Sequence, residues 1–128
     1  MAGRLILDSG ALIGWQRGDR KIWGYLAEAA ERGTSVVVPA VVLTECIRGG
    51  SRDAAIHRLV TGARVPFIGK RVAVQAGRLL GRAGMSATVD ALVAAEAIRG
   101  GPCIVLTSDP GDLGTLLDKT PYVRVVGV

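Results

Sequence analysis

The sequence is poor in the side chains from which zinc sites and disulfide frameworks are built. It contains one histidine, His57, and two cysteines, Cys46 and Cys103, which stand far apart and form no Cys-x-x-Cys pair. Thiols in apolar surroundings like these are typically buried and reduced, so we interpret both as free cysteines. His57 falls on a helix with a polar pattern, and we assign it no catalytic role.

Long apolar runs are also lacking. No stretch approaches the roughly 20 apolar residues that a membrane span needs. Residues 1–4 lead directly into a short apolar segment, without the extended apolar region of a signal peptide. We therefore expect a cytoplasmic protein with no membrane contact. Since the chain has 128 residues and no linker-like tract, we also expect one domain over residues 1–128.

Acidic residues are fewer than basic ones. The chain has 16 Lys and Arg against 11 Asp and Glu, which gives a net charge of +5. Such an excess is a weak indication of a polyanionic partner. A basic surface without any partner is the alternative explanation of the composition, and the placement of the acids has to decide.

Short apolar runs alternate with segments of helical period along the whole chain. Strands are predicted at residues 5–7, 36–38, 65–68, 103–106 and 123–126. Helices are predicted at residues 11–16, 22–32, 39–48, 51–60, 71–82 and 110–117, and a further one begins at Ser86 or Thr88 and runs to residue 99. This alternation predicts an α/β fold, with a central parallel β-sheet flanked by helices on both faces.

Four acids are placed where such a fold brings chain segments together. Asp8 ends the first predicted strand, and Asp109 follows the strand at 103–106. Glu45 lies in the helix after the second strand, and Asp90 lies in the first turns of the helix before 103–106. Ligands bind at the carboxyl edge of open α/β sheets, so we expect these four carboxylates to meet there.

Two of these acids fall on helix faces that are otherwise apolar. Glu45 lies three residues after Val42, and Asp90 shares a face with Val93 and Ala94. An inward carboxylate is costly unless it is paired or binds a metal, and several together raise one another's pKa. A divalent cation removes this cost. Oxygen-only donors favour Mg²⁺, with Mn²⁺ able to substitute.

Three of the acids, taken singly, also suit a purely structural role. Asp8 and Asp109 each suit a helix N-cap, and Asp90 is favoured by the positive end of its helix. Glu45 suits no such role, and the four together favour a metal site. Asp112, one turn after Asp109, is either a further ligand or a surface acid. If all five converge, the rest of the chain carries 16 basic and six acidic residues, a net charge of +10 that attracts phosphate.

These motifs, in this order, resemble the PIN-domain family and specifically the VapC-type toxins of bacterial toxin–antitoxin pairs. The resemblance extends over essentially the whole chain, and its motifs are Leu5-Ile6-Leu7-Asp8-Ser9, Thr44-Glu45, Asp90-Ala91-Leu92 and Leu106-Thr107-Ser108-Asp109. Two positions depart from the usual pattern. Gly10 stands where a polar residue is also common, and Asp112-Leu113 stands where many relatives have His-Phe or Asp-Phe.

The resemblance implies a Mg²⁺-dependent endoribonuclease that hydrolyses RNA phosphodiester bonds as the toxin of a type II toxin–antitoxin system. It assigns catalysis and metal binding to Asp8, Glu45, Asp90 and Asp109. Ser9 and Thr107 either support the carboxylates by hydrogen bonds or are ordinary turn residues. The resemblance also implies a cognate antitoxin, whose Arg-containing tail covers the acidic site, and a homodimer.

Alternative functions remain open within this family, whereas two classes outside it each lack a required acid. A housekeeping PIN-fold nuclease, or a catalytically silent PIN-fold RNA-binding module, carries the same motifs. A haloacid-dehalogenase-type phosphatase needs a second acid where Gly10 stands, and a receiver domain needs an Asp where Gly69 and Lys70 follow the strand at 65–68. We interpret Glu96 as a solvated side chain.

Overall fold

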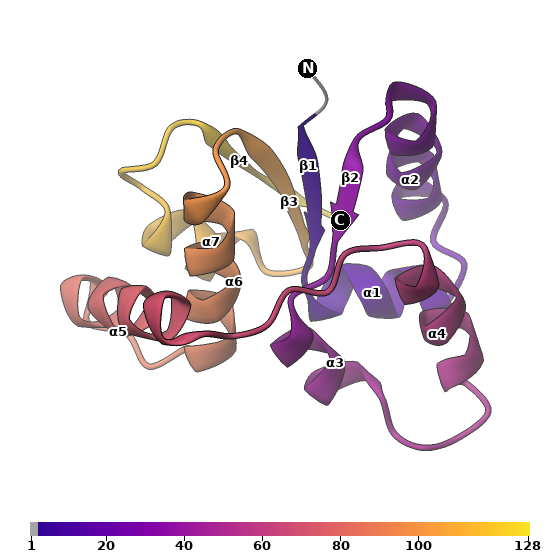
Figure 1. The fold of residues 1–128 in the computed structure, drawn as a ribbon, viewed down its shortest axis with the longest axis horizontal. Coiled ribbons are helices and arrows are strands. Elements are labelled where there is room, and N and C mark those ends of the chain that lie inside the picture. Colours follow the sequence, from indigo (N-terminus) through magenta and orange to yellow (C-terminus); the bar gives the residue numbers. More distant parts are fainter. Residues whose placement is uncertain (1–2) are drawn as a thin grey trace.

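A sheet of four parallel strands forms the centre of the computed structural model, which describes residues 3–128 (Figure 1). The strands are β1 (Arg4–Leu7), β2 (Ser35–Val37), β3 (Cys103–Thr107) and β4 (Val123–Gly127). Their order is β2-β1-β3-β4, with every neighbouring pair parallel. The predicted parallel α/β architecture is therefore confirmed. Met1 and Ala2, on which the signal-peptide expectation partly rests, lie outside the described residues.

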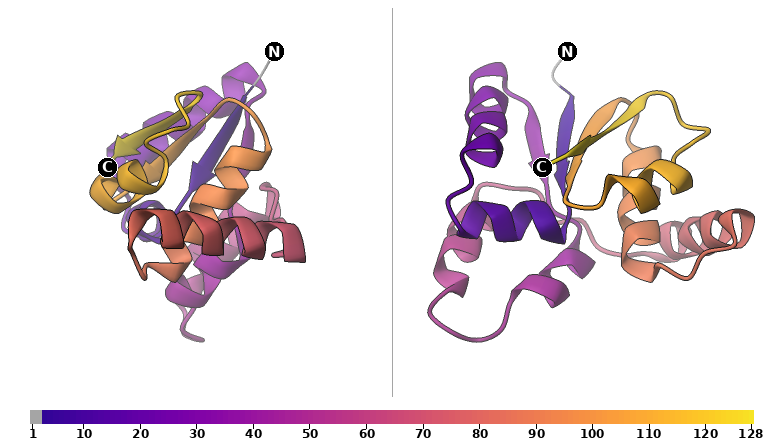
Figure 2. Two further views of the ribbon diagram at one scale, coloured as in Figure 1. Left: turned by 90° about the vertical axis from the view of Figure 1, so that its left-hand side faces the viewer. Right: turned by 180° about the vertical axis from the view of Figure 1, so that it is seen from behind.

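Helices cover both faces of the sheet. They are α1 (Ser9–Gln16), α2 (Arg20–Arg32), α3 (Ala40–Cys46), α4 (Asp53–Thr61), α5 (Lys70–Ala83), α6 (Thr88–Arg99) and α7 (Pro110–Leu116). Figure 2 shows α1 and α2 on one face, and α6 with α5 outside it on the other. Ile6 and Leu7 of β1 and Val105 and Leu106 of β3 are fully buried, as expected of central parallel strands.

One predicted strand is wrong. Residues 65–68 form no strand, and only Arg64 contacts the sheet, through a single bridge to Val37 at the edge of β2. The Arg64 amide donates to the Val36 carbonyl at 2.9 Å, and the Val38 amide donates to the Arg64 carbonyl at 2.8 Å. Pro66 then follows, and because it lacks an N–H group the ladder cannot continue.

Glu96 is also placed differently from the expectation. It is buried, with Oε2 3.5 Å from Nη1 of Arg99. The reason is that α5 packs over the outer side of α6, so that the run from Val93 to Ala97 is buried without interruption. The middle of α6 is therefore enclosed on the side where Glu96 was expected to meet solvent.

The sequence predicts that no segment of the chain spans a membrane, and this can be compared with the length and polarity of the helices. Among residues 3–128, no helix has both the length and the apolar character needed to cross a bilayer.

Candidate active site

The ends of β1 and β3 set the position of the first two acids. β1 and β3 are neighbours, with Leu7 paired to Leu106 in register. Asp8 directly follows β1, and its amide donates to the Leu106 carbonyl at 3.1 Å. Asp109 lies two residues beyond the end of β3. Because the strands are parallel, both acids stand at the same carboxyl edge of the sheet.

Asp8 is buried and held by hydrogen bonds. One carboxyl oxygen, Oδ1, accepts from the amide of Ala11 at 3.1 Å, so Asp8 also caps α1. Burial raises the pKa of the Asp8 carboxyl. Hydrogen bonds from the Thr107 side chain and from the amides of Ala11 and Gly10 oppose that rise, and the negative charge of Glu45 adds to it. The helix cap therefore uses only one carboxyl oxygen of Asp8. Capping alone does not explain why this acid is buried, because burying a carboxylate is costly.

A tight group of carboxylates lies next to this edge. Asp90, in the first turn of α6, and Asp109 and Asp112, at the start of α7, offer oxygens that all lie within 4.8 Å of one another. Asp109 occupies the N-cap position of α7, yet within residues 3–128 its side chain makes no capping hydrogen bond. Capping therefore does not account for this acid.

Asp90 is the electrostatic centre of the site. Burial raises the pKa of its carboxyl to about 6, and the charges of Asp8, Asp112, Asp109 and Glu45 all contribute to the rise. Each of the other four predicted acids is thus close enough to repel a charge on Asp90. The fold brings all five to one place, with Asp90, Asp109 and Asp112 closest together.

Glu45 lies at the rim of this group rather than inside it. Its side chain is exposed, so the expectation that it points inward with Val42 is wrong. The short helix α3 buries Val42 and Cys46 instead, and this leaves Glu45 at the solvent side. Its charge still reaches the interior, because it helps to raise the pKa values of Asp8 and Cys46.

The two cysteines are free and buried, as predicted. Burial raises the pKa of the Cys46 thiol to about 11, with the charge of Glu45 as the next cause. The Cys46 thiol donates to the carbonyl of Ser9 at 3.7 Å, which ties α3 to the start of α1. Both thiols remain protonated and inert at neutral pH.

The two residues predicted to support the site differ in their placement. Thr107 is fully buried between Asp8 and Asp109, and its Oγ1 accepts from the Asp109 amide at 2.9 Å. Ser9 is half-buried, and its carbonyl accepts a hydrogen bond from the Cys46 thiol, which is not one of the acids. The structure therefore gives Thr107 a direct contact with two of the acids.

Gly10 has a role that the sequence did not reveal. A Cβ atom at this position would overlap the side chain of Ser108, so the first turn of α1 packs against the segment after β3 only because residue 10 has no side chain. The departure of Gly10 from the family pattern was the only available signal. This contact keeps the loops that carry Asp8 and Asp109 together.

Two further contacts hold the elements that carry the acids. The guanidinium of Arg4 donates to the carbonyls of Glu96, Ala97 and Gly101 at 3.2, 2.8 and 3.0 Å, which fixes the end of α6 to the start of β1. The buried carboxyl of Asp53 accepts from the amides that follow α3, including that of Gly49 at 2.7 Å. These contacts limit movement of α6 and α3.

The donor set fits a hard divalent cation. Three carboxylate oxygens within 4.8 Å of one another need only small side-chain rotations to share one ion. No histidine or cysteine belongs to the group, which disfavours zinc and favours Mg²⁺ or Mn²⁺.

Comparisons with known proteins agree with this architecture. A family model described as "PIN domain" matches residues 5–111. No curated protein sequence matches significantly. Among solved structures, VapBC2 from Rickettsia felis bound to a promoter DNA fragment is similar, with 12% sequence identity and a TM-score of 0.73. The match covers 97% of this chain and 98% of that chain.

Two further solved structures are similar. A toxin-antitoxin complex from Klebsiella pneumoniae is 15% identical, with 97% of this chain and 99% of that chain covered and a TM-score of 0.73. VapBC-1 from nontypeable Haemophilus influenzae is 14% identical, with 96% of each chain covered and a TM-score of 0.66. At these identities the likeness concerns the fold.

Proposed function

The chain belongs to the PIN domain family, and from that premise we propose that it is a metal-dependent endoribonuclease that acts as the toxin of a type II toxin–antitoxin pair. The observation that carries the proposal is the gathering of four further carboxylates, those of Asp8, Glu45, Asp109 and Asp112, around Asp90. Like charges held at one place repel one another, which favours a ligand of opposite charge there.

The residues divide into two groups in this proposal. Asp90, Asp109 and Asp112 hold the cation, because their oxygens are closest together. Asp8 and Glu45 complete the negative site and orient the attacking water. A bound Mg²⁺ ion supplies a charge that polarises the scissile phosphate and lowers the pKa of water at the site. Thr107 keeps the Asp8 carboxyl in place through its hydroxyl group.

The charge distribution supports RNA as the substrate class. The five acids are confined to the site, and the rest of the chain has 16 basic and six acidic residues. A basic surface attracts phosphates and releases counterions from the nucleic acid when it binds. A divalent cation held by these carboxylates would make a phosphate group tolerable among them.

The proposal of a toxin role rests on which proteins share this fold. The similar structures include complexes of a toxin with an antitoxin, and each is covered by this chain nearly end to end. We propose a small antitoxin as partner, with an Arg that pairs with the carboxylates and blocks RNA. A homodimer of this chain is part of the same proposal.

The test is hydrolysis of total RNA by the purified chain. We expect cleavage with Mg²⁺ or Mn²⁺, none with EDTA, and a loss of roughly 100-fold or more in rate for Asp90→Asn. Glu31→Gln, a change of the same kind at an exposed position of α2, serves as the matched control. Metal-independent cleavage, or an Asp90→Asn protein as active as the control, would overturn the assignment.

A further inference from the structure

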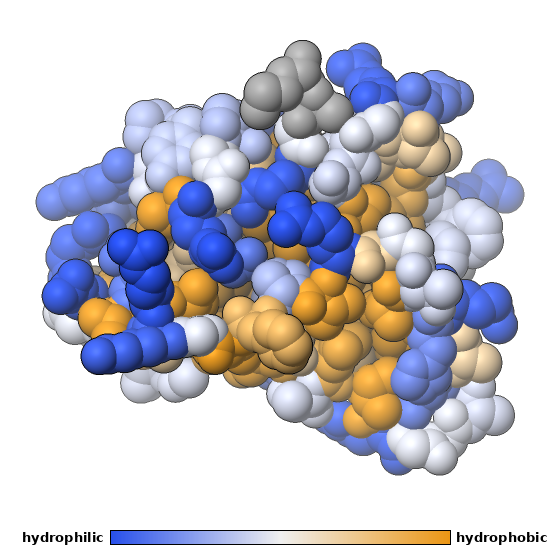
Figure 3. Space-filling view, in the orientation of Figure 1, coloured by the Kyte–Doolittle hydropathy of each residue, from blue (hydrophilic) through white to orange (hydrophobic). Residues whose placement is uncertain are grey.

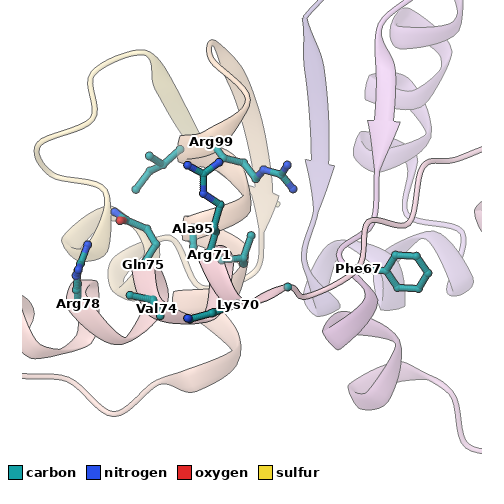
Figure 4. A pocket seen from close by; sticks show the side chains of 11 residues that line it. Phe67, Lys70, Arg71, Val74, Gln75, Arg78, Ala95 and Arg99 are labelled. Atoms are coloured by element: carbon teal, nitrogen blue, oxygen red, sulfur yellow. The ribbon is translucent and has the colours of Figure 1, made fainter.

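A groove of about 1000 Å³ lies between α5 and the later part of α6 (Figure 4). Its walls carry four cationic side chains, Lys70, Arg71, Arg78 and Arg99. None of the five clustered acids lines it, and Asp90 lies in the first turn of α6, at the other end of that helix from Arg99. The groove is therefore separate from the acidic site but shares a helix with it.

The charged residues of this part of the sequence are all positive. Residues 54–89 contain six Lys and Arg and no Asp or Glu. Within residues 3–128, Lys70, Arg71 and Arg78 form no ion pair, and Arg99 pairs only with Glu96 at 3.5 Å. Lys70 and Arg71 also occupy the first turn of α5, where the helix dipole disfavours positive charge. Lys70 and Arg71 thus do not serve the stability of α5.

An exposed aromatic ring lies at one end of the groove. Phe67 is 92% exposed, and its ring points away from α5 (Figure 4). Figure 3 shows apolar side chains in the centre of this face with hydrophilic ones beside them. The ring of Phe67 lies apart from the cations in Figure 4, but Phe67 precedes Lys70 by only three residues. Single-stranded nucleic acids bind to such a combination, because cations contact phosphates and an exposed ring stacks on a base.

We propose that this groove binds a single-stranded segment of RNA that adjoins the scissile bond. Lys70, Arg71, Arg78 and Arg99 contact its phosphates, and Phe67 stacks on an unpaired base. The choice of RNA rests on the proposed function. Asp90 and Arg99 are nine residues apart on α6, about 13 Å along the axis, which a few nucleotides can span.

Charge also favours RNA over a second copy of this chain as the occupant. A copy carries a net charge of +5, and it would have to present acids to four cations. Outside the acidic site only six acids are left, and two of them, Asp53 and Glu96, are buried. Like-charged surfaces disfavour such a contact.

The first test measures RNA binding in EDTA, so that binding is read without cleavage. Fluorescence anisotropy with a labelled single-stranded RNA of about 12 nucleotides compares the wild type with Lys70→Gln/Arg71→Gln. We expect weaker binding, and a plot of log affinity against log salt whose slope is smaller by about 1.4, or about 0.7 for each lost phosphate contact. The matched control, Arg58→Gln/Lys119→Gln, removes two exposed charges outside the groove and should leave the slope unchanged.

A second variant tests stacking. Phe67→Ala removes an exposed ring, so the fold should survive, and single-strand affinity should fall about 5-fold or more. The salt slope and the affinity for a duplex of the same length should not change. Equal losses in the groove and control variants would overturn the proposal. So would a groove variant that binds RNA normally but sediments as a smaller species, because the groove would then join two copies.

The outcomes separate this inference from the proposed function. A chain that binds single-stranded RNA through the groove but cleaves nothing with Mg²⁺ supports the groove and refutes the nuclease. A chain that cleaves RNA while the groove variants bind and cleave like the control supports the nuclease and refutes the groove.

Discussion

The amide of Asp109 donates a 2.9 Å hydrogen bond to Oγ1 of Thr107, two residues earlier in the chain. The same hydroxyl group lowers the pKa of the Asp8 carboxyl by hydrogen bonding. Thr107 is fully buried at the end of β3, so one side chain links the acid after β1 to the acid after β3. This link accounts for the presence of a hydroxyl at a core position.

Replacing Thr107 by Val tests the link. The shape is nearly conserved, but the Asp109 amide loses its acceptor and Asp8 loses a donor, so the free energy of unfolding should fall by about 1–3 kcal/mol. Urea unfolding measures it. Thr107→Ser keeps the hydroxyl and should retain most of the stability and the RNA cleavage. A Val variant as stable and active as wild type would contradict the link.

The raised pKa of Asp90 makes the metal-free protein sensitive to pH. The carboxyl titrates near 6 in the native state and near its usual value of 3.8 when unfolded, so the native state binds more protons between these values. Its contribution to stability is therefore present at low pH and lost as pH rises to about 6. Allowing for solvent screening, the loss is on the order of 1–2 kcal/mol.

Asp90→Asn should remove this dependence. In EDTA the variant should be more stable than wild type at neutral pH, and the difference should shrink as the pH falls towards about 4. Thermal unfolding across that range measures it, with Glu31→Gln as the exposed control. A variant less stable than wild type at neutral pH would show that the like-charge repulsion at Asp90 is not the dominant effect.

Metal binding should reverse the cost of the clustered charges. At neutral pH, Mg²⁺ or Mn²⁺ at roughly 100 times its dissociation constant should add about 2.7 kcal/mol to stability. Asp112→Asn should weaken this effect, because Asp112 belongs to the closest group of oxygens. Asp118→Asn, an exposed change nearby in sequence, should not. A melting temperature indifferent to both metals would count against the assigned ligands.

The contact between Gly10 and Ser108 is testable by a double-mutant cycle. Gly10→Ala forces a methyl group into the Ser108 side chain and should destabilise the protein by about 1–3 kcal/mol. Adding Ser108→Gly removes the overlapping atoms and should recover part of that loss. Strictly additive effects of the two changes would mean that the two residues do not interact.

Expression in cells tests the toxin role. Produced alone, the wild type should slow growth and Asp8→Asn should not, while both accumulate to similar levels. Co-expression with the product of an adjacent short reading frame should restore growth and yield a stable complex. Harmless expression of a chain that cleaves RNA in vitro would instead indicate a housekeeping PIN nuclease.

The sequence by itself determined the order of the helices and of the four strands of the sheet, the parallel sheet and the acids that come together. Buried parallel strands appear as continuous apolar runs, and an acid directly after such a run is carried to the carboxyl edge whatever surrounds it. Asp8 and Asp109 are examples, and their positions follow from β1 and β3 alone. Asp90 does not follow a strand, but it lies in the first turn of α6, the helix that leads into β3.

Only the tertiary structure decided how exposed each side chain is and which acids lie closest. The helical period of a sequence predicts which side chains share a face of one helix. Whether that face is buried depends on the elements that pack against the helix. Thus α5 buries Glu96 from outside, and short α3 leaves Glu45 exposed. The segment after Arg64 has the pattern of a strand, yet it borders only one edge and meets Pro66, so it pairs at a single residue. The close grouping of Asp112 with Asp90 likewise depends on α6 and α7 packing together, a contact between segments that no local pattern encodes.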